Sequence, residues 1–287
     1  MDQPDPPPAK IGRYDIVRRL GVGGMAEVFE ARSPGAAGFS KTVVVKRMLP
    51  HLSHQPYYAN MFVREAKIAA SVNHRTVVQV FELDQLESGE YFMVMEFVRG
   101  PDLRQMLARA AQVKRRLPPW FSVYCVAEVL DGLDYAYNAL DDKGQPRKMI
   151  HRDVTPSNIF VSMLGEVKLG DFGVARDDTF ASETRAGQHK GKVAYMAPEQ
   201  LLNQGVDGRV DVFSAGVVLW ECLTQSRLFG GKPDLEAMNL IVNAPRRPPS
   251  SIKPDVAKEI DEIVIAALEP DPDRRIPSAK AFRARLL

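Results

Sequence analysis

The sequence has few cysteines and no long apolar run. Only Cys125 and Cys222 occur among 287 residues, and such a distant pair has no spacing typical of a metal site or a disulfide framework. We therefore predict two buried thiols in a reducing, cytoplasmic setting. The longest apolar stretches, at residues 217–220 and 263–268, are far shorter than the roughly 20 residues that span a bilayer. No membrane segment is expected within the chain.

An excess of charge of one sign is also missing. Thirty-eight basic residues against 36 acidic ones give a net charge of +2, which does not favour nucleic acid or an anionic membrane as the main partner. The hydrophobic share of 45% and the charged share of 26% are typical of a globular protein. The start, MDQPDPPPAK, is proline-rich and acidic where a signal peptide is basic and then apolar, so we predict a disordered leader over residues 1–13.

Two parts of the chain differ in periodicity. Residues 14–98 contain short β-branched runs and turns, with one helical segment near residues 60–72, which predicts a small sheet with one helix. From residue 99 to residue 287 the apolar spacing is mainly helical. We therefore predict an α+β protein with two lobes, divided near residues 98 and 99.

A glycine-rich segment lies between two predicted strands of the first part. Its residues are Leu20, Gly21, Val22, Gly23, Gly24, Met25, Ala26, Glu27 and Val28. Glycine lets backbone amides approach phosphate oxygens without a Cβ in the way, so the segment is a candidate nucleotide-binding turn. Taken alone, a plain glycine-rich hairpin is equally consistent with it.

A lysine and a glutamate of the first part are candidates for a buried pair. Alternation in the run TVVVK places Lys46 on the same strand face as Val44. In the following helix, Glu65 lies in the apolar stripe. Because an unpaired buried charge is very costly, we predict that Lys46 and Glu65 pair, which leaves the ammonium available to nucleotide phosphates. The alternative is that Glu65 extends to solvent.

Three motifs downstream occur in a fixed order. Residues 150–160 read IHRDVTPSNIF, residues 171–173 read DFG, and residues 197–199 read APE. The first fits His-Arg-Asp followed by four residues and an Asn. With these motifs, the chain from residue 14 onward resembles a bacterial eukaryotic-type (Hanks-type) serine/threonine protein kinase, with further agreement at Asp211 and Arg275. The resemblance implies a bilobal protein-kinase fold, with an antiparallel sheet and helix C in the N-lobe and a mainly α C-lobe.

This resemblance also implies roles for single residues. Asp153 orients the substrate hydroxyl and accepts its proton, while Asn158 and Asp171 hold Mg²⁺ against the phosphates of ATP. The adenine is expected between apolar residues and backbone groups of the two lobes. These residues are Leu20, Val28, Val44, Met95, Glu96, Val98 and Phe160, with Asp102 near the ribose. The resemblance further implies that Glu199 and Arg275 form a buried ion pair that supports the substrate-docking loop.

One departure from the family concerns the catalytic loop. Serine/threonine kinases usually carry Lys two residues after the catalytic Asp, where this chain has Thr155. The family commonly has Gly-Thr in the docking loop, where this chain has Gly-Lys at residues 191–192. Since the two positions touch in the family fold, we hypothesise that Lys192 and Thr155 form an inverted pair beside Asp153. The alternative is that Lys192 points to solvent and that catalysis relies on Lys46 and Mg²⁺.

Regulation and partners follow from the same resemblance. Arg152 is typical of kinases that bind a phosphorylated residue of the activation loop, for which Thr179, Ser182 and Thr184 are candidates. Protein substrates are expected, with a homodimer as one route to autophosphorylation, and the chain is equally consistent with the cytoplasmic domain of a longer protein. Two alternatives remain, a pseudokinase that binds nucleotide without turnover and a small-molecule phosphotransferase.

Overall fold

The computed structural model describes residues 6–141, 143–172 and 192–287. The chain divides into two compact units, of which the first contains residues 1–73 and 78–98 and the second contains residues 74–77 and 99–287. Cys125 and Cys222 are buried free thiols, as predicted. Within the described residues, no helix is both long and apolar enough to cross a bilayer.

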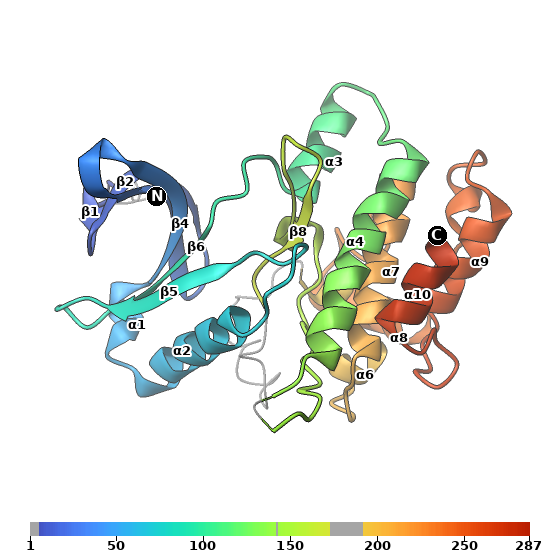
Figure 1. The fold of residues 1–287 in the computed structure, drawn as a ribbon. Helices are drawn as coiled ribbons and strands as arrows, with labels where there is room; N and C mark the ends of the chain where they lie inside the picture. Colours follow the sequence, from blue (N-terminus) through green and yellow to red (C-terminus); the bar gives the residue numbers. More distant parts are fainter. Residues whose placement is uncertain (1–5, 142, 173–191) are drawn as a thin grey trace. The chain divides into compact units, whose positions relative to one another are not determined.

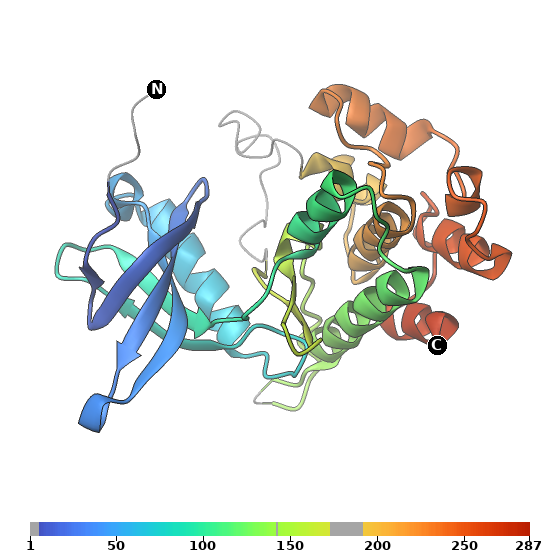
Figure 2. The ribbon, with the colours of Figure 1, turned by 90° about the horizontal axis from the view of Figure 1, so that it is seen from above.

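The first unit is built on a six-stranded antiparallel sheet with the strand order β1-β2-β3-β4-β6-β5 (Figures 1 and 2). The strands are β1 (Lys10–Ile11), β2 (Tyr14–Val22), β3 (Ala26–Pro34), β4 (Ser40–Met48), β5 (Val80–Gln85) and β6 (Tyr91–Glu96). Val43 and Val45 of β4 are buried, whereas Val44 and Lys46, on the opposite face, are slightly more exposed. The period of two read from the sequence is therefore present in the sheet.

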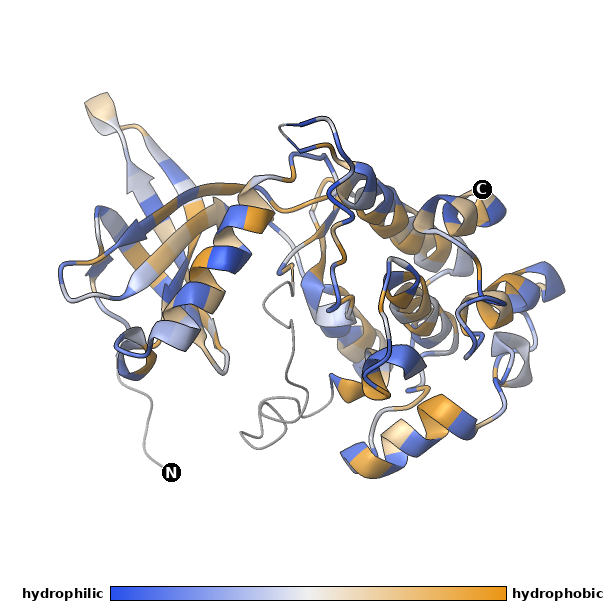
Figure 3. Cartoon of the chain, turned by 90° about the horizontal axis from the view of Figure 1, so that it is seen from below, coloured by the Kyte–Doolittle hydropathy of each residue, from blue (hydrophilic) through white to orange (hydrophobic). Residues whose placement is uncertain are grey.

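One long helix, α2 (Pro56–Ala70), packs against strands β5 and β6; the short elements η1 (Ala36–Gly38) and α1 (Pro50–Ser53) flank β4. Hydrophobic and hydrophilic residues alternate along α2 in Figure 3, and its buried side includes Met61, Phe62 and Glu65. The helix begins four residues before the predicted start because Pro56 occupies its first turn, where a missing N–H costs nothing.

The predicted leader is too long at its C-terminal end. Lys10 and Ile11 form β1, which pairs with β2, and Ile11 is only 1% exposed. A buried isoleucine next to a paired strand is enough to order this segment, although the proline-rich residues before it suggested otherwise. Residues 1–5 lie outside the described part of the chain.

The second unit is mainly helical. Its elements are α3 (Leu103–Gln112), α4 (Pro119–Asn138), η2 (Pro156–Asn158), β7 (Ile159–Val161), β8 (Val167–Leu169), η4 (Val193–Tyr195), α6 (Pro198–Leu201), α7 (Arg209–Thr224), α8 (Asp234–Asn243), η5 (Pro249–Ser251), α9 (Lys258–Ala267) and α10 (Ala279–Leu286). Strands β7 and β8 form a small antiparallel hairpin. In Figure 1, α4 lies beside both α7 and α10, in agreement with their packing contacts.

Helix α7 is the core of the second unit. Every residue from Val210 to Thr224 is buried, including the acidic residues Asp211 and Glu221 near its two ends. A helix that is buried all round offers a rigid platform. Side chains of α7 hydrogen-bond to the backbone of the catalytic loop and to Tyr195 of η4.

Candidate active site

The predicted lysine–glutamate pair is present in the first unit. Lys46 Nζ donates to Glu65 Oε1 at 2.6 Å, and both side chains are about nine-tenths buried, with exposed fractions of 13% and 10%. Strand β4 and helix α2 hold the two residues, since Lys46 is paired across the sheet with Met93 and Glu65 lies on the apolar side of α2. The pair places a buried, compensated ammonium on one face of the sheet.

Apolar residues lie on the same sheet face as Lys46. Val28 pairs with Lys46 across β3 and β4, and Val44 pairs with Met95 across β4 and β6. Directly opposed residues of antiparallel strands share a face. These three apolar side chains are half-buried. The face therefore combines apolar surface with one cation, as an adenine nucleotide requires.

The glycine-rich segment forms the hairpin turn between β2 and β3. Gly23 N–H donates to the Ala26 carbonyl at 2.8 Å, and a Cβ added at Gly21 would meet no atom within 4 Å. Gly21, Val22, Gly23 and Gly24 are exposed. The chain itself does not fill the space beside Gly21, which leaves the backbone approachable.

Not every residue of the predicted nucleotide set joins this face. The Glu27 side chain forms ion pairs with Arg19 Nη2 at 3.0 Å and Arg47 Nη2 at 2.8 Å, on the face opposite to Val28 because the two are neighbours along β3. Any contact of Glu27 with a nucleotide must therefore be made by its backbone. Leu20 is 40% exposed, while Glu96 and Val98 are half-buried.

In the second unit, the catalytic-loop residues lie close together. Asn158 Nδ2 donates to the Asp153 carbonyl at 2.8 Å and to Asp153 Oδ2 at 3.1 Å. Asp153 and Asn158 are buried, with exposed fractions of 6% and 7%. Because the amide nitrogen of Asn158 is committed to Asp153, its side-chain oxygen is the atom suited to bind a cation.

His151 connects this loop to the segment before Asp171. Asp153 N–H donates to His151 Nδ1 at 3.2 Å, so the ring proton is on Nε2, which donates to the Gly170 carbonyl at 3.1 Å. Burial lowers the pKa of His151 to about 4, so the ring stays neutral near pH 7. Its centroid lies 4.5 Å from that of Phe172. His151 and Phe172 thus pack together.

Asp171 follows directly and is held close to Asn158 through the backbone. Gly170 N–H donates to the Asn158 carbonyl at 2.8 Å, and Asp171 is exposed with a left-handed φ of 55°. Non-glycine residues rarely adopt this conformation, which is found where the surrounding structure requires it.

The carboxylate of Asp211, on α7, holds the backbone of the catalytic loop. Asp211 Oδ2 accepts from His151 N–H at 2.7 Å, and Oδ1 accepts from Arg152 N–H at 2.8 Å. Burial raises the pKa of Asp211 to about 6, although both hydrogen bonds favour its ionised form. Sequence reasoning noted Asp211 only as a family match, yet a carboxylate inside the apolar run VDVFSAGVV is itself a signal of a buried hydrogen-bonding role.

Lys192 contacts the carboxylate of Asp153. Its Nζ lies 2.7 Å from Asp153 Oδ2, and its side chain is 42% exposed. The next element, η4, is buried. Its residue Tyr195 makes two hydrogen bonds to α7. Its hydroxyl donates to Glu221 Oε2 at 2.7 Å, and its carbonyl accepts from the Ser214 hydroxyl at 2.7 Å. Lys192 therefore does not simply point to solvent.

Thr155 contributes less to this arrangement than predicted. It is buried, with 4% exposed, and its carbonyl accepts from Asn158 N–H at 3.0 Å. Among the hydrogen bonds of the described residues, none joins the Thr155 hydroxyl to Lys192. Lys192 thus contacts Asp153 directly, as the hypothesised exchange requires. For Thr155, the structure shows a position in the same loop but no hydrogen bond to Lys192.

The residues present fit a divalent cation that is shared with phosphate. In the described segments, no three His, Cys, Asp or Glu side chains cluster in a way that could hold a metal on their own. Mg²⁺, however, usually takes one or two protein oxygens and completes its shell with substrate phosphates and water. Asn158 and Asp171 offer such a small oxygen set.

Asp102 and Phe160 are brought together by an isolated antiparallel bridge. Asp102 also begins α3, where its Oδ1 accepts from Gln105 N–H at 2.7 Å in a reciprocal capping box. Burial raises the pKa of Asp102. Its helix-capping role is a structural one, and a ribose contact would use the remaining carboxylate oxygen.

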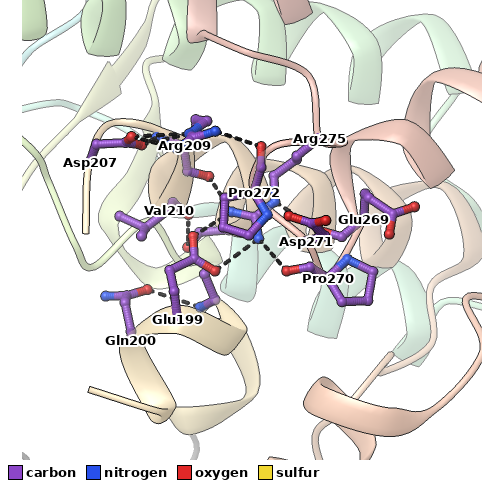
Figure 4. A network of polar contacts seen from close by, with 12 residues as sticks. Glu199, Gln200, Asp207, Arg209, Val210, Glu269, Pro270, Asp271, Pro272 and Arg275 are labelled. Atoms are coloured by element: carbon purple, nitrogen blue, oxygen red, sulfur yellow. Dashed lines mark hydrogen bonds and ion pairs between the residues drawn. The ribbon is translucent and has the colours of Figure 1, made fainter. Parts of the chain in front are cut away.

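The predicted pair of Glu199 and Arg275 is present and fully buried (Figure 4). Arg275 Nη1 and Nη2 donate to the two carboxylate oxygens at 2.6 and 2.9 Å. The other donors reach the carbonyls of Glu269, Arg209 and Pro270. The side chains of Arg275 and Glu199 are only 0% and 4% exposed, so each depends on the other for charge compensation.

We expect Glu199→Gln to lower the free energy of unfolding by about 3 kcal/mol or more, because it leaves the Arg275 charge buried without a counter-charge. Urea denaturation measures this change. The matched control is Glu236→Gln, which removes an exposed ion pair with Lys232 and should cost about 0.5 kcal/mol or less. Equal shifts for the two variants would contradict the prediction.

The predicted activation-loop sites Thr179, Ser182 and Thr184 lie outside the described residues. Arg152, expected to bind a phosphorylated side chain, is described; it has a left-handed φ of 63° and donates its N–H to Asp211.

The curled sheet with its Lys–Glu pair and the helical unit with its Asp–Asn loop define a protein-kinase-like phosphotransferase. The family model described as "Protein kinase domain" matches residues 14–287. The chain belongs to the protein kinase family, and the resemblance stated from the motifs and the predicted fold class are confirmed.

Individual relatives are bacterial kinases. The tyrosine-protein kinase MasK of Myxococcus xanthus is 40% identical over 94% of this chain, and the serine/threonine-protein kinase PknB of Mycolicibacterium smegmatis is 34% identical over 96% of it. In each case the chain spans 42% of the relative's length. The solved PknI kinase domain of Mycobacterium tuberculosis matches with a TM-score of 0.69 and 25% identity, over 96% of both chains.

Proposed function

We propose that this domain transfers the γ-phosphate of ATP to serine or threonine hydroxyls of proteins. The observation that carries the proposal is the convergence on one carboxylate: Asp153 Oδ2 lies 3.1 Å from Asn158 Nδ2 and 2.7 Å from Lys192 Nζ. A carboxylate held by an amide and an ammonium is fixed in orientation, which is what positioning of an attacking hydroxyl requires.

In the proposed step, the acceptor oxygen attacks the γ-phosphorus and forms the new O–P bond. The bond to the β,γ-bridging oxygen breaks, ADP leaves with that electron pair, and the acceptor proton passes to the Asp153 carboxylate. Lys192 stays beside Asp153, where its partly exposed ammonium stabilises the negative charge of the transferring group. His151 and Asp211 hold the loop and do not exchange protons with substrate.

The nucleotide-binding residues are assigned to both units. In the first, Lys46 binds phosphate oxygens, the backbone from Leu20 to Val28 covers the phosphates, and the Val44 face contacts adenine. In the second, Asn158 and Asp171 would hold Mg²⁺. When bound, that ion neutralises phosphate charge that would otherwise repel the acceptor oxygen.

A tyrosine hydroxyl is the second candidate acceptor. The observation that favours it is the 40% identity to a relative named as a tyrosine-protein kinase, against 34% for the PknB relative cited above. A pseudokinase is the third candidate, suggested by Thr155 in place of the usual lysine. The direct contact of Lys192 with Asp153 supports turnover, because it restores a cation next to that carboxylate.

Labelling with radioactive ATP, Mg²⁺ and a generic basic protein, followed by phosphoamino-acid analysis, tests the proposal. We expect phosphoserine and phosphothreonine on the substrate. Phosphotyrosine alone would assign the second candidate, and ATP binding without any transfer would assign the pseudokinase. The same gel reports autophosphorylation, for which Thr179, Ser182 and Thr184 stay predicted sites.

The proposed setting is the cytoplasm, where ATP and protein substrates are available. The domain is equally suited to act alone or as the cytoplasmic part of a longer protein. Protein substrates are the proposed partners, a second copy of the chain among them, because a homodimer lets one copy phosphorylate the other. No nucleic-acid partner is proposed, since the charge of the chain is balanced.

A further inference from the structure

A cavity of about 230 Å³ lies against the catalytic loop in the second unit. Pro156, three residues after Asp153, forms part of its wall, together with Leu107 of α3 and the chain that follows α7. Three residues of extended chain span at most about 11 Å. Asp153 and Pro156 are therefore at most about 11 Å apart. About three residues of an extended substrate peptide span the same distance, so a peptide that presents a hydroxyl to Asp153 can also place a side chain in the cavity.

The cavity is lined by two guanidinium groups from segments far apart in the sequence. Arg104 lies on the exposed side of α3, and Arg227 lies in the turn after α7. Among the described residues, the Arg104 side chain has no hydrogen-bond or ion-pair partner. Its guanidinium is therefore not held by a direct pair and interacts only through space with Asp102 in the described part of the chain.

Acidic charge in the cavity wall does not cancel this charge. Of the lining residues that the structure describes, Glu221 alone is acidic, and its side chain is 2% exposed. It accepts from the Tyr195 hydroxyl at 2.7 Å, from Arg227 Nη1 at 3.3 Å and from Leu228 N–H at 3.1 Å. These donors use both carboxylate oxygens. Arg227 is 48% exposed, and its Nη1 contacts Glu221 and the Tyr195 hydroxyl.

An additional donor in the wall has no partner. Gln225 Nε2 is buried and makes no hydrogen bond with the described protein. A left-handed φ of 54° at Gln225 ends α7 and sets this side chain beside the cavity. A buried amide donor without an acceptor is costly, and an oxygen ligand would satisfy it. Two guanidinium groups and one amide together favour an anionic oxygen ligand.

We infer that this cavity binds an anionic side chain of the protein substrate, a carboxylate or a phosphate, within about three residues of the phosphorylated hydroxyl. The inference rests on the proposed function and adds a substrate class to it: proteins with an acidic or previously phosphorylated residue close to the acceptor. Arg104 is the specificity-determining residue, and Gln225 and Arg227 complete the set of donors.

Synthetic peptides test this inference. Each contains one acceptor, in a serine series and a tyrosine series, and a single Glu, phosphoserine or Gln at each flanking position in turn. We expect kcat/KM to be roughly three- to tenfold higher for an anion than for Gln at one or two positions, as for a partly exposed charge-assisted pair. Preference for either anion supports the site, and the size of the two preferences distinguishes carboxylate from phosphate.

Arg104→Ala should bring the anion-to-Gln ratio close to one, and Arg104→Glu should produce a preference for Lys at the same position. The matched control is Arg109→Ala, because Arg109 is exposed on the same helix but lies about 140° around it. Its side chain bonds to Gln112 and to no other residue that the structure describes. That variant should keep the ratio of the unmodified chain. No anion preference in an active enzyme, or a preference that survives Arg104→Ala, overturns the inference alone. Absence of transfer to every peptide and protein overturns the proposed function as well.

Discussion

Asp153→Asn is expected to lower turnover about 1000-fold while ATP binding is retained. Asparagine keeps the shape of the side chain but cannot take the acceptor proton, and general-base groups contribute roughly 100- to 10,000-fold. It also removes the negative charge that Lys192 and Asn158 now share. The loop should keep its conformation, because Asp211 and His151 hold it through backbone groups.

Steady-state transfer to a protein substrate, with ATP affinity measured in parallel, separates the two effects. A matched control is Asp84→Asn, which changes an exposed aspartate at the end of β5 and should leave turnover within about twofold of the unmodified chain. Thermal melting verifies that both variants are folded. Turnover of Asp153→Asn within a few-fold of the control would remove Asp153 from the catalytic role.

The sequence predicted those contacts of the site that a local pattern of strand or helix residues indicates, or that the family resemblance implies. The Lys46–Glu65 pair followed from one strand face and one helix stripe, because a carboxylate in an apolar stripe requires a cation. The buried pair of Glu199 and Arg275 and the contact of Lys192 with Asp153 followed from the resemblance, since residues that far apart carry no spacing signal. Nothing local indicated that Glu27 would form ion pairs with Arg19 and Arg47.

The cavity beside the catalytic loop was out of reach for the same reason. Its walls come from α3, the loop at Pro156 and the end of α7 with the chain that follows it, and only the fold brings these segments together. Lys10 and Ile11 were predicted to be disordered because the segment is rich in proline. They form a strand instead, in which Ile11 is buried. Tertiary contacts of this kind override local composition.

Lys192→Ala is expected to lower turnover roughly 100-fold with little change in ATP affinity. The ammonium lies 2.7 Å from Asp153 Oδ2 yet is 42% exposed, so it can stabilise charge on the transferring phosphoryl group. Removal of one preorganised donor of this kind usually costs about 100- to 1000-fold. Lys192→Met keeps the length of the side chain without its charge, and it should show the same loss if charge is what matters. Turnover near that of the unmodified chain in either variant would contradict the role.

A charge exchange decides whether Thr155 and Lys192 share one function. Lys192→Thr alone should be as impaired as Lys192→Ala, whereas Lys192→Thr combined with Thr155→Lys should regain at least about tenfold, because the lysine returns from the catalytic loop itself. Thr155→Lys alone is the control: it adds a second ammonium beside Asp153 and should not raise turnover. A double variant no better than Lys192→Thr would show that the cation acts only from the docking-loop side. Recovery would mean that Asp153 needs one neighbouring lysine, which can be residue 155 or residue 192.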